Sequence, residues 1–455
     1  MRPLTRLSTK VLALFFACCT ALLLTGCGGS SGSGTPGNAA TYTISATVSG
    51  LNGSGLILQN NGTNNLSVIA NGTVVFSTQL SSSSAYAITV FHDPDTPTQW
   101  CQVGKAGGVV AAANVSNITV TCNNGPRAAY VANYSGNTVS QYALSTTDGS
   151  LSAIAPGTVI TNTNPHSLAI GPTGRYAYTA DFGSNRVSQY TIAVATGALT
   201  AMVPAPAITD TNPNSIAMDP TGQYAYVTNA VSNTVSQYTV SAVDGSLTAM
   251  APTSVATGTT PNSVAVDPTG RFVYVSNSGN NTISQYRIGA GGALSAMAPA
   301  TVVAGTTPSS VAIDPAGRWI YVANAGGNTV TQFAISSTSG QLTQITTTIT
   351  GSNPKSLTID PTGRYAYVAN YNDNTVSQYT VSAANGALLA ITPATASAGI
   401  NPHSVAVDPT GRYAYVANYG NNTASQFTIG AGGALTPMAT ASLVTGIQPI
   451  SVVVR

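Results

Sequence analysis

The segment Pro361-Thr-Gly-Arg-Tyr-Ala-Tyr-Val-Ala-Asn370 decides the fold, because near copies of it recur through most of this 455-residue chain. It opens with a tight-turn sequence, in which proline fixes φ and glycine permits a positive φ. An alternating run ending in Tyr-Val-Ala-Asn follows, and a period of two is typical of a β-strand. Seven tetrapeptides follow one another at spacings of 48, 48, 48, 47, 46 and 48 residues: Tyr130-Val-Ala-Asn133, Tyr178-Thr-Ala-Asp181, Tyr226-Val-Thr-Asn229, Tyr274-Val-Ser-Asn277, Tyr321-Val-Ala-Asn324, Tyr367-Val-Ala-Asn370 and Tyr415-Val-Ala-Asn418.

One unit of this repeat predicts four antiparallel strands. Residues 263–267, 271–276 and 282–288 form the first three, and residues 294–302 form a weaker outer strand. Turns that contain glycine, asparagine or proline separate them. Four strands in a unit of about 40–50 residues are typical of a β-propeller blade.

The two ends of the repeat region predict a closed ring. The first copy begins at Arg127 without the strand that opens every other unit, whereas residues 448–454 have the sequence of that opening strand with no unit after it. If the C-terminal strand completes the first blade, no sheet edge is left open. We therefore predict an all-β fold in which residues 127–455 form a seven-bladed β-propeller closed by the C-terminal strand.

The amino-terminal residues have the sequence of a lipoprotein signal peptide. Three basic residues precede an apolar run over residues 11–24, which is shorter than the roughly 20 residues needed to span a bilayer. The sequence Leu24-Thr-Gly-Cys27 resembles the lipobox of bacterial lipoproteins, whose cysteine receives a diacylglyceryl group before cleavage. We expect residues 1–26 to be removed, Cys27 to anchor the chain in a lipid bilayer, and residues 27–40 to form a Gly/Ser tether. The expected location is the bacterial cell envelope, at the outer membrane, because no aspartate follows Cys27.

Residues 41–123 do not repeat, and they are predicted to form a small β-sandwich-like domain. Short alternating runs such as residues 42–48 and 115–120 are separated by turn signals such as Asn52-Gly53. Cys101 and Cys122 are the two cysteines that remain after export and lipidation. We therefore predict a disulfide that ties the last strand to an earlier loop. A spacer or adhesive role is expected for this domain.

The composition excludes several partners and cofactors. Only 6% of the residues are charged, and all 12 acidic residues are aspartates. Removal of the three basic residues of the signal peptide takes the formal charge from +2 to about −1, so nucleic acid, which binds a basic face, is not an expected partner. The three histidines and the cysteines lack metal-ligand spacing, so neither a metal nor a cofactor is predicted.

The Tyr-Val-Ala/Thr-Asn copies resemble the YVTN-repeat propellers and the lactonase family of seven-bladed β-propellers, which includes 6-phosphogluconolactonase-like proteins. The resemblance covers residues 127–455. Blade two carries Asn164-Pro-His-Ser167 and the turn Asp181-Phe-Gly-Ser-Asn-Arg186, which are similar to segments on the active-site face of the family. The resemblance implies that His166 is the acid–base residue and that Asp181 and Arg186 orient it or bind an anionic lactone.

The loops that enter the first strand of each blade are expected to surround the mouth of the central channel. The residue after the proline varies there, and four such residues are candidate ligand-binding side chains: Asn214, Asn262, Lys355 and His403. The asparagine of Tyr-x-x-Asn recurs in nearly every blade, so we assign it to turn geometry.

Two functions remain open on these observations. The regular repeat, the scarcity of charge and the absence of glutamate favour a surface-displayed module that binds a small molecule, such as a lactone or sugar, or a surface protein. The alternative is a lactone hydrolase resembling 6-phosphogluconolactonase, with its site on the channel face of blade two. Such an enzyme needs a base to activate water and donors for the oxyanion.

Arginine recurs at one position in six copies of the repeat. Aspartates precede four of these arginines by four residues, so local Asp–Arg ion pairs are predicted in preference to an anion-binding ring. The arginines are Arg127, Arg175, Arg271, Arg318, Arg364 and Arg412, and the aspartates are Asp267, Asp314, Asp360 and Asp408.

Overall fold

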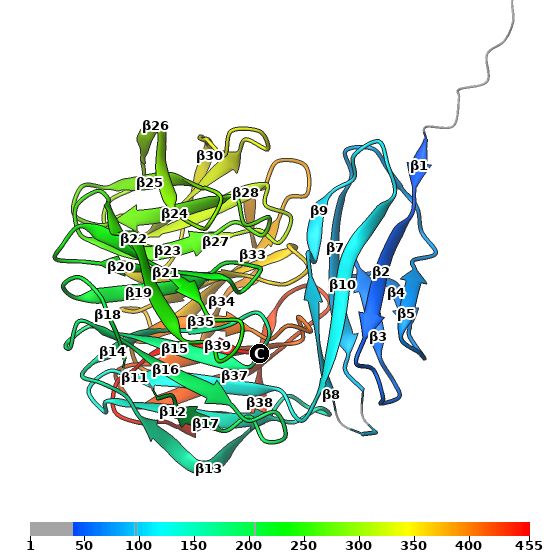
Figure 1. The fold of residues 1–455 in the computed structure, drawn as a ribbon, viewed down its shortest axis with the longest axis horizontal. Coiled ribbons are helices and arrows are strands. Elements are labelled where there is room, and N and C mark those ends of the chain that lie inside the picture. Colours follow the sequence, from blue (N-terminus) through cyan, green and yellow to red (C-terminus); the bar gives the residue numbers. More distant parts are fainter. Residues whose placement is uncertain (1–39, 95, 98, 204–205) are drawn as a thin grey trace, which may run out of the picture. The chain divides into compact units, whose positions relative to one another are not determined.

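A computed structural model describes residues 40–455 with the exception of 95, 98, 204 and 205. The predicted signal peptide and Cys27 therefore lie outside the described residues. Residues 40–455 form one compact unit that is built from β-strands (Figure 1). Within this range, no helix has both the length and the apolar character needed to cross a bilayer.

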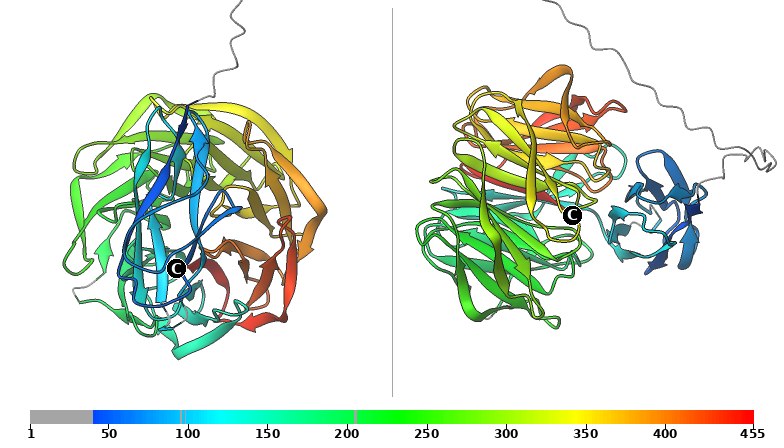
Figure 2. Two further views of the ribbon diagram at one scale, coloured as in Figure 1. Left: turned by 90° about the vertical axis from the view of Figure 1, so that its right-hand side faces the viewer. Right: turned by 90° about the horizontal axis from the view of Figure 1, so that it is seen from above.

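Seven antiparallel sheets follow one another in chain order and are arranged around a ring (Figure 2). Their innermost strands are β14 (Pro165–Ile170), β19 (Pro213–Met218), β23 (Pro261–Val266), β27 (Pro308–Ile313), β31 (Pro354–Ile359), β35 (Pro402–Val407) and β39 (Pro449–Val454). The second strands are β11 (Ala128–Asn133), β15 (Tyr176–Asp181), β20 (Tyr224–Asn229), β24 (Phe272–Asn277), β28 (Trp319–Asn324), β32 (Tyr365–Asn370) and β36 (Tyr413–Asn418). The third strands are β12 (Thr138–Leu144), β16 (Arg186–Ile192), β21 (Thr234–Val240), β25 (Thr282–Ile288), β29 (Thr329–Ile335), β33 (Thr375–Val381) and β37 (Thr423–Ile429). The outer strands are β13 (Leu151–Ile160), β17 (Leu199–Ala201) with β18 (Ala207–Ile208), β22 (Leu247–Ala256), β26 (Leu294–Val303), β30 (Leu342–Ile349), β34 (Leu388–Ser397) and β38 (Leu435–Val444).

The C-terminal strand closes the ring as the repeat count predicts. Strand β39 pairs antiparallel with β11, so that Tyr130 lies opposite Val453. The backbone N–H of Arg455 then donates to the carbonyl of Ala128 at 3.0 Å. The predicted all-β, seven-bladed fold is confirmed.

Each blade repeats three motifs: Pro-x-Ser in the inner strand, Tyr-x-x-Asn or Tyr-x-x-Asp in the second strand, and Gln followed by Tyr or Phe in the third. One side chain of each motif, the serine, the tyrosine or the glutamine, forms a hydrogen bond to the next blade, which explains why the motif recurs. The serine hydroxyl accepts a hydrogen bond from a backbone N–H group of the next inner strand at 3.1–3.3 Å. The accepting serines are Ser167, Ser215, Ser263, Ser310, Ser356, Ser404 and Ser451. The tyrosine hydroxyl donates to a glycine carbonyl of the next blade at 2.5–2.9 Å, from Tyr130, Tyr178, Tyr226, Tyr274, Tyr321, Tyr367 and Tyr415. The glutamine side-chain oxygen accepts a leucine N–H of the next blade at 2.6–2.9 Å, at Gln141, Gln189, Gln237, Gln285, Gln332, Gln378 and Gln426.

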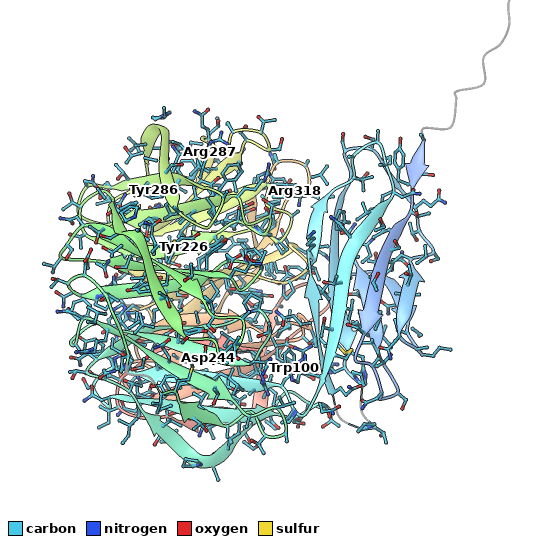
Figure 3. The ribbon with its side chains drawn as sticks, viewed as in Figure 1. Trp100, Tyr226, Asp244, Tyr286, Arg287 and Arg318 are labelled. Atoms are coloured by element: carbon cyan, nitrogen blue, oxygen red, sulfur yellow. A yellow bond between two sulfur atoms is a disulfide. The ribbon has the colours of Figure 1, made fainter. Side chains whose placement is uncertain are left out.

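These inter-blade tyrosines also supply much of the core. Tyr226, labelled among the sheets in Figure 3, is fully buried, and its hydroxyl is bonded to Gly292 at 2.7 Å. A buried tyrosine contributes a large apolar ring, while its bonded hydroxyl avoids the cost of an unpaired polar group. The same residue type therefore packs the interface and fixes its register.

The prediction of Asp–Arg ion pairs is wrong for three of the four turns between the inner and second strands. Asp267 is almost fully buried, and one of its carboxylate oxygens accepts the N–H groups of Arg271 and Phe272, both at 2.6 Å. The Arg271 guanidinium instead lies over the Phe272 ring, 4.9 Å from its centroid. Because the turn amides occupy the carboxylate, the arginine stacks on the aromatic face. Among the four predicted Asp–Arg pairs, Arg318 (Figure 3) forms the only direct ion pair recorded in the described structure, to Asp314 at 3.1 Å.

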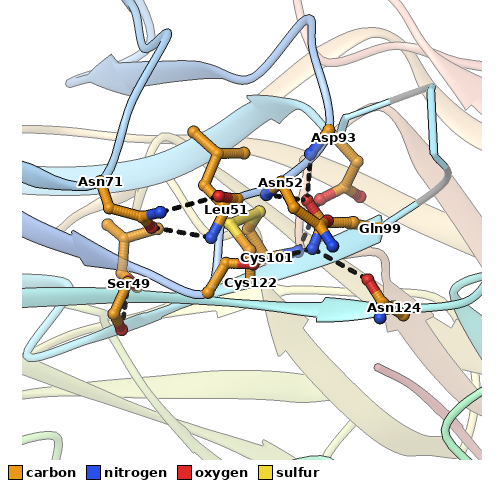
Figure 4. The surroundings of a disulfide bond; sticks show 12 residues. Ser49, Leu51, Asn52, Asn71, Asp93, Gln99, Cys101, Cys122 and Asn124 are labelled. Carbon is orange, nitrogen blue, oxygen red and sulfur yellow. Dashed lines mark hydrogen bonds between the residues drawn. A yellow bond between two sulfur atoms is a disulfide. The ribbon is translucent and has the colours of Figure 1, made fainter.

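Residues 41–124 form a sandwich of two four-stranded sheets and a short two-stranded one. Its strands are β1 (Thr41–Tyr42), β2 (Ile44–Ser49), β3 (Ile57–Asn60), β4 (Asn64–Ser67), β5 (Gly72–Val75), β6 (Leu80–Ser81), β7 (Ala85–His92), β8 (Gln99–Gly104), β9 (Gly107–Val109) and β10 (Val115–Asn124). The disulfide Cys101–Cys122 is present (Figure 4). Cys101 does not lie in a loop, however: it is in β8, directly opposite Cys122 of the neighbouring strand β10.

Candidate functional site at the mouth of the propeller

The residue that follows each inner-strand proline is placed in the channel by a β-bulge. In blade two, Pro165 pairs with Asp181 and Ser167 with Ala180, so His166 is the extra residue between them. The same register shift occurs in the other six blades. A bulge re-aims the side chain of its extra residue, and here it turns seven variable residues toward the axis. They are His166, Asn214, Asn262, Ser309, Lys355, His403 and Ile450.

These side chains line two adjoining cavities, which we call the mouth and the channel. The mouth has a volume of about 350 Å³ and is lined by His166, Lys355, His403 and Ile450 together with four aromatic residues. The channel below has a volume of about 210 Å³ and adds Asn214, Asn262, Ser309 and the ring of inter-blade serines. The structure therefore brings together His166 and all four residues predicted to bind a ligand.

Both histidines of the mouth are held in one tautomer. His166 Nδ1 lies 2.9 Å from the carbonyl oxygen of Asn214, and His403 Nδ1 lies 2.9 Å from that of Ile450. A carbonyl oxygen can only accept, so each Nδ1 carries the proton and each Nε2 keeps a free lone pair. The two rings are nearly perpendicular, with centroids 6.0 Å apart.

Burial keeps both imidazoles neutral. It lowers the pKa of His166 to about 4, because desolvation disfavours the cation and Lys355 repels it. Burial, the neighbouring His166 and Lys355 lower the pKa of His403 to about 3. At neutral pH the mouth therefore contains two unprotonated bases.

An aromatic wall surrounds the two histidines on one side. It consists of Tyr134, Phe182, Tyr371 and Tyr419, which each follow the Asn or Asp of a Tyr-x-x-Asn copy. The His166 ring centroid lies 6.0 Å from that of Tyr134 and 5.8 Å from that of Phe182. His403 lies 6.2 Å from Tyr371 and 6.1 Å from Tyr419.

The opposite side of the mouth is small and polar. The positions equivalent to the aromatic wall are Ala230, Ser278 and Ala325 in blades three to five. The Asn214 side-chain nitrogen donates to the Asn262 carbonyl at 3.3 Å and also to the Asn262 side-chain oxygen. The site is thus aromatic over blades six, seven, one and two, and polar over the others.

The structure does not bring Asp181 and Arg186 into this site. Asp181 is fully buried at the end of β15, where its carboxylate accepts bonds from Ser188 N–H at 3.0 Å, Ser188 O–H at 2.6 Å and Thr179 O–H at 2.8 Å. Desolvation by burial raises the pKa of Asp181 to about 6, although these hydrogen bonds oppose the shift. Arg186 pairs with Asp181 across the β15–β16 ladder, and neither residue lines the mouth or the channel.

The ring of residues after proline follows from the repeat, whereas the aromatic wall was not predicted. The missed signal was the residue just after Tyr-x-x-Asn, which changes from aromatic to small around the ring. In a nearly constant repeat, a position that varies from blade to blade is a candidate for the functional surface.

Comparison with known proteins identifies the family. The sequence model of the lactonase family of seven-bladed β-propellers matches residues 29–351, 295–394 and 338–449, so the chain belongs to that family. No curated protein matches the sequence.

Solved structures agree on the fold. A periplasmic gluconolactonase of Pseudomonas aeruginosa, PpgL, superposes with a TM-score of 0.63 at 22% identity, covering 72% of this chain and 98% of its own. A candidate 6-phosphogluconolactonase of Bacteroides fragilis gives a TM-score of 0.64 at 19% identity, covering 72% and 98%. A protein of Lactobacillus plantarum gives 0.63 at 21% identity, covering 72% and 99%. At these identities the similarity establishes the propeller fold alone.

Proposed function

We propose that the mouth of the propeller is the active site of an exported lactone hydrolase. The proposal rests on the state of the two histidines, whose Nδ1–H groups are fixed on carbonyl oxygens while the unprotonated Nε2 atoms are free for chemistry in a cavity of about 350 Å³. A bare imidazole nitrogen within reach of water is a general base. The family, and the activity named for the Pseudomonas neighbour, support a sugar-sized lactone as substrate.

In the proposed reaction, Nε2 of His166 takes a proton from water as the oxygen attacks the lactone carbonyl carbon. The Asn262 amide, whose oxygen already accepts from Asn214, offers its N–H to the resulting oxyanion. The ring C–O bond then breaks, and the leaving alkoxide recovers the proton from the imidazolium. The product is an open hydroxy acid, and His403 is placed to act as a second base.

Asp181 and Arg186 have a different role in this proposal. Asp181 holds the end of β15, from which the turn carrying Phe182 projects toward His166. We therefore propose Asp181 as a positioning residue and assign Arg186 no contact with the substrate.

The test is hydrolysis of sugar, aryl and homoserine lactones by residues 41–455. We expect His166→Ala to lower kcat by about 10²–10⁴, the usual contribution of a general base. His92→Ala is the matched control, because His92 lies in β7 of the sandwich. Equal rates in the wild type and a His166→Ala/His403→Ala double variant would refute the proposal.

A binding module without turnover is the second candidate. It is favoured because no carboxylate lines the mouth or the channel among the described residues, and because burial makes both histidines weak bases. Calorimetry on the same lactones separates the two functions: a module binds a lactone that it does not open.

We also propose that the protein acts in the cell envelope, held there by lipid on Cys27. The lipobox-like sequence Leu24-Thr-Gly-Cys27 supports this location. The Pseudomonas neighbour, named as a periplasmic protein, is consistent with it.

A further inference from the structure

Lys355 is the one charged side chain among the described residues that line the mouth and the channel. It follows Pro354 at the bulge of blade six, so the fold directs it toward the axis. Its recorded contact is with an aromatic face: Nζ lies 5.6 Å from the Tyr371 ring centroid. No hydrogen bond or ion pair to Lys355 is found within the described part of the chain.

A half-buried ammonium group without an anionic partner is unfavourable. Burial lowers the pKa of Lys355 below its usual range, because water solvates the cation incompletely at this position. The Lys355 cation also lowers the pKa of His166 and of His403, so it interacts electrostatically with both histidines of the mouth. Buried charges in folded proteins are normally paired, and none of the described residues pairs with Lys355, which points to an anion carried by a ligand.

The neighbouring groups limit what that anion is attached to. The four aromatic side chains that line the mouth suit a flat or cyclic ligand. On the other side of Ser309, the Asn262 amide offers a neutral donor. The Ser309 hydroxyl itself is already bonded to the Pro354 carbonyl at 2.7 Å, so Lys355 is the strongest donor left in the mouth.

We propose that Lys355 is the anion-binding residue of the mouth and that it selects sugar-sized ligands bearing one carboxylate or phosphate group. This inference deepens the proposed function, because it names the class of ligand that the same site accepts. A carboxylate or phosphate accepts charge-assisted hydrogen bonds from the ammonium group. Neutral sugars of the same size lack that interaction.

The test measures binding without turnover. Titration calorimetry compares D-gluconate, D-glucose 6-phosphate and D-glucose at constant ionic strength on residues 41–455. We expect at least one of the two anions to bind about tenfold or more tightly than glucose, the usual effect of a hydrogen bond to a charged group. Which anion binds better shows whether the natural group is a carboxylate or a phosphate.

Two variants show whether the preference belongs to Lys355. In Lys355→Gln the anion preference should disappear, whereas Lys355→Arg should retain most of it. Lys105→Gln removes the other described lysine, which is exposed in the sandwich, and should bind like the wild type. Anion preference that survives Lys355→Gln, or equal binding of all three ligands to the wild type, overturns the inference.

The outcomes also separate this inference from lactone hydrolysis. Anion binding lost in Lys355→Gln, in a protein that opens no lactone, supports the ligand class and refutes the enzyme. Hydrolysis of lactones with no anion preference does the reverse.

Discussion

Asp181 stands where the other six copies of the repeat have asparagine. Its surroundings explain how the fold accommodates a carboxylate at this position. Asn162 stands where the corresponding loop has glycine in blade one and in blades four to seven. Its amide lies 2.8 Å from Ser188 Oγ and 3.4 Å from the Asp181 carboxylate. Blade three has the exchanged pair, with Asp210 in the loop and Asn229 at the strand end. Each of these two blades thus carries one carboxylate and one amide at the same corner.

Asp181→Asn should stabilise the protein at neutral pH. The raised pKa of about 6 means that the folded state binds a proton more readily than the unfolded chain does. The ionised form is therefore destabilising above that value, by about 1 kcal/mol or more. Chemical unfolding should show an advantage for the variant that is small near pH 4, grows up to about pH 6 and is constant above.

The reverse change is the control. Asn277→Asp places a carboxylate in blade four, where Gly258 provides no amide side chain. This variant should be less stable than the wild type at pH 7 and recover as the pH falls. A stabilising effect of both changes would contradict the explanation.

The pH dependence of hydrolysis tests the tautomer and burial of His166. Its pKa is lowered to about 4, so the neutral base persists well below the range of an exposed histidine. We expect kcat/KM, which reports the pKa values of the free enzyme, to remain constant from neutral pH down to about 5 and to fall below that, with a midpoint near 4. A midpoint near 6.5 would mean that the acting base is not this buried imidazole.

At this scale the sequence predicts the ring after proline but not the companions of His166. The ring follows from one repeated position, so counting residues is sufficient. The grouping of His166 with Asp181 and Arg186 depends on where a bulge turns each side chain, and adjacency in sequence does not contain that information. His166 lies in the bulge, whereas Asp181 ends a strand and points into the blade.

The turn between the third and outer strands of blade one requires glycine at one position. Gly149 has φ of 73°, and a Cβ added there would lie 2.4 Å from the Tyr413 ring of the preceding blade. Its carbonyl also accepts the Tyr415 hydroxyl. This glycine therefore allows two blades to approach closely.

Gly149→Ala should lower the free energy of unfolding by about 1–3 kcal/mol, because both the positive φ and the contact are unfavourable. Gly291→Ala is the matched control in a turn of the same kind, since Gly291 also has a positive φ, of 85°, but a Cβ there meets nothing within 4 Å. Thermal or denaturant unfolding measures the difference. Equal losses in both variants would show that the interface contact is unimportant.

Strand prediction succeeds better in the propeller than in the sandwich, for a physical reason. Seven copies of a blade average out local exceptions, so β25 is predicted with its observed limits at Thr282 and Ile288. The sandwich has one copy of each strand, and β8 has no clear alternation of apolar and polar residues. The pattern therefore predicts a loop at Cys101, where the structure has a strand.

For the whole molecule, the predicted lipid anchor has a direct test. In cells, Cys27→Ser should release the protein from the membrane fraction, and mass spectrometry of the wild type should show a diacylglyceryl group. The matched control Cys101→Ser/Cys122→Ser removes the disulfide and should leave the lipid in place. An unlipidated Cys27 in the wild type would contradict the prediction.

Removal of residues 449–455 should disrupt the ring more than its length suggests. The deletion takes away β39, which is the inner strand of blade one, together with Ser451 and its hydrogen bond to blade two. It exposes the edge of β11, an edge that favours aggregation. We expect the truncated chain to be largely insoluble, and size-exclusion chromatography of the refolded protein measures this.

The closing strand also sets when folding can finish. Six blades are complete in the chain before residue 449, but blade one waits for residues 449–454, because β39 is its inner strand. Until residues 449–454 have left the ribosome or an export channel, the chain remains an open arc in which β11 is paired with β12 alone. Completion of the ring is therefore coupled to the pairing of β39 with β11, and the mouth, to which Ile450 belongs, is complete only after that step.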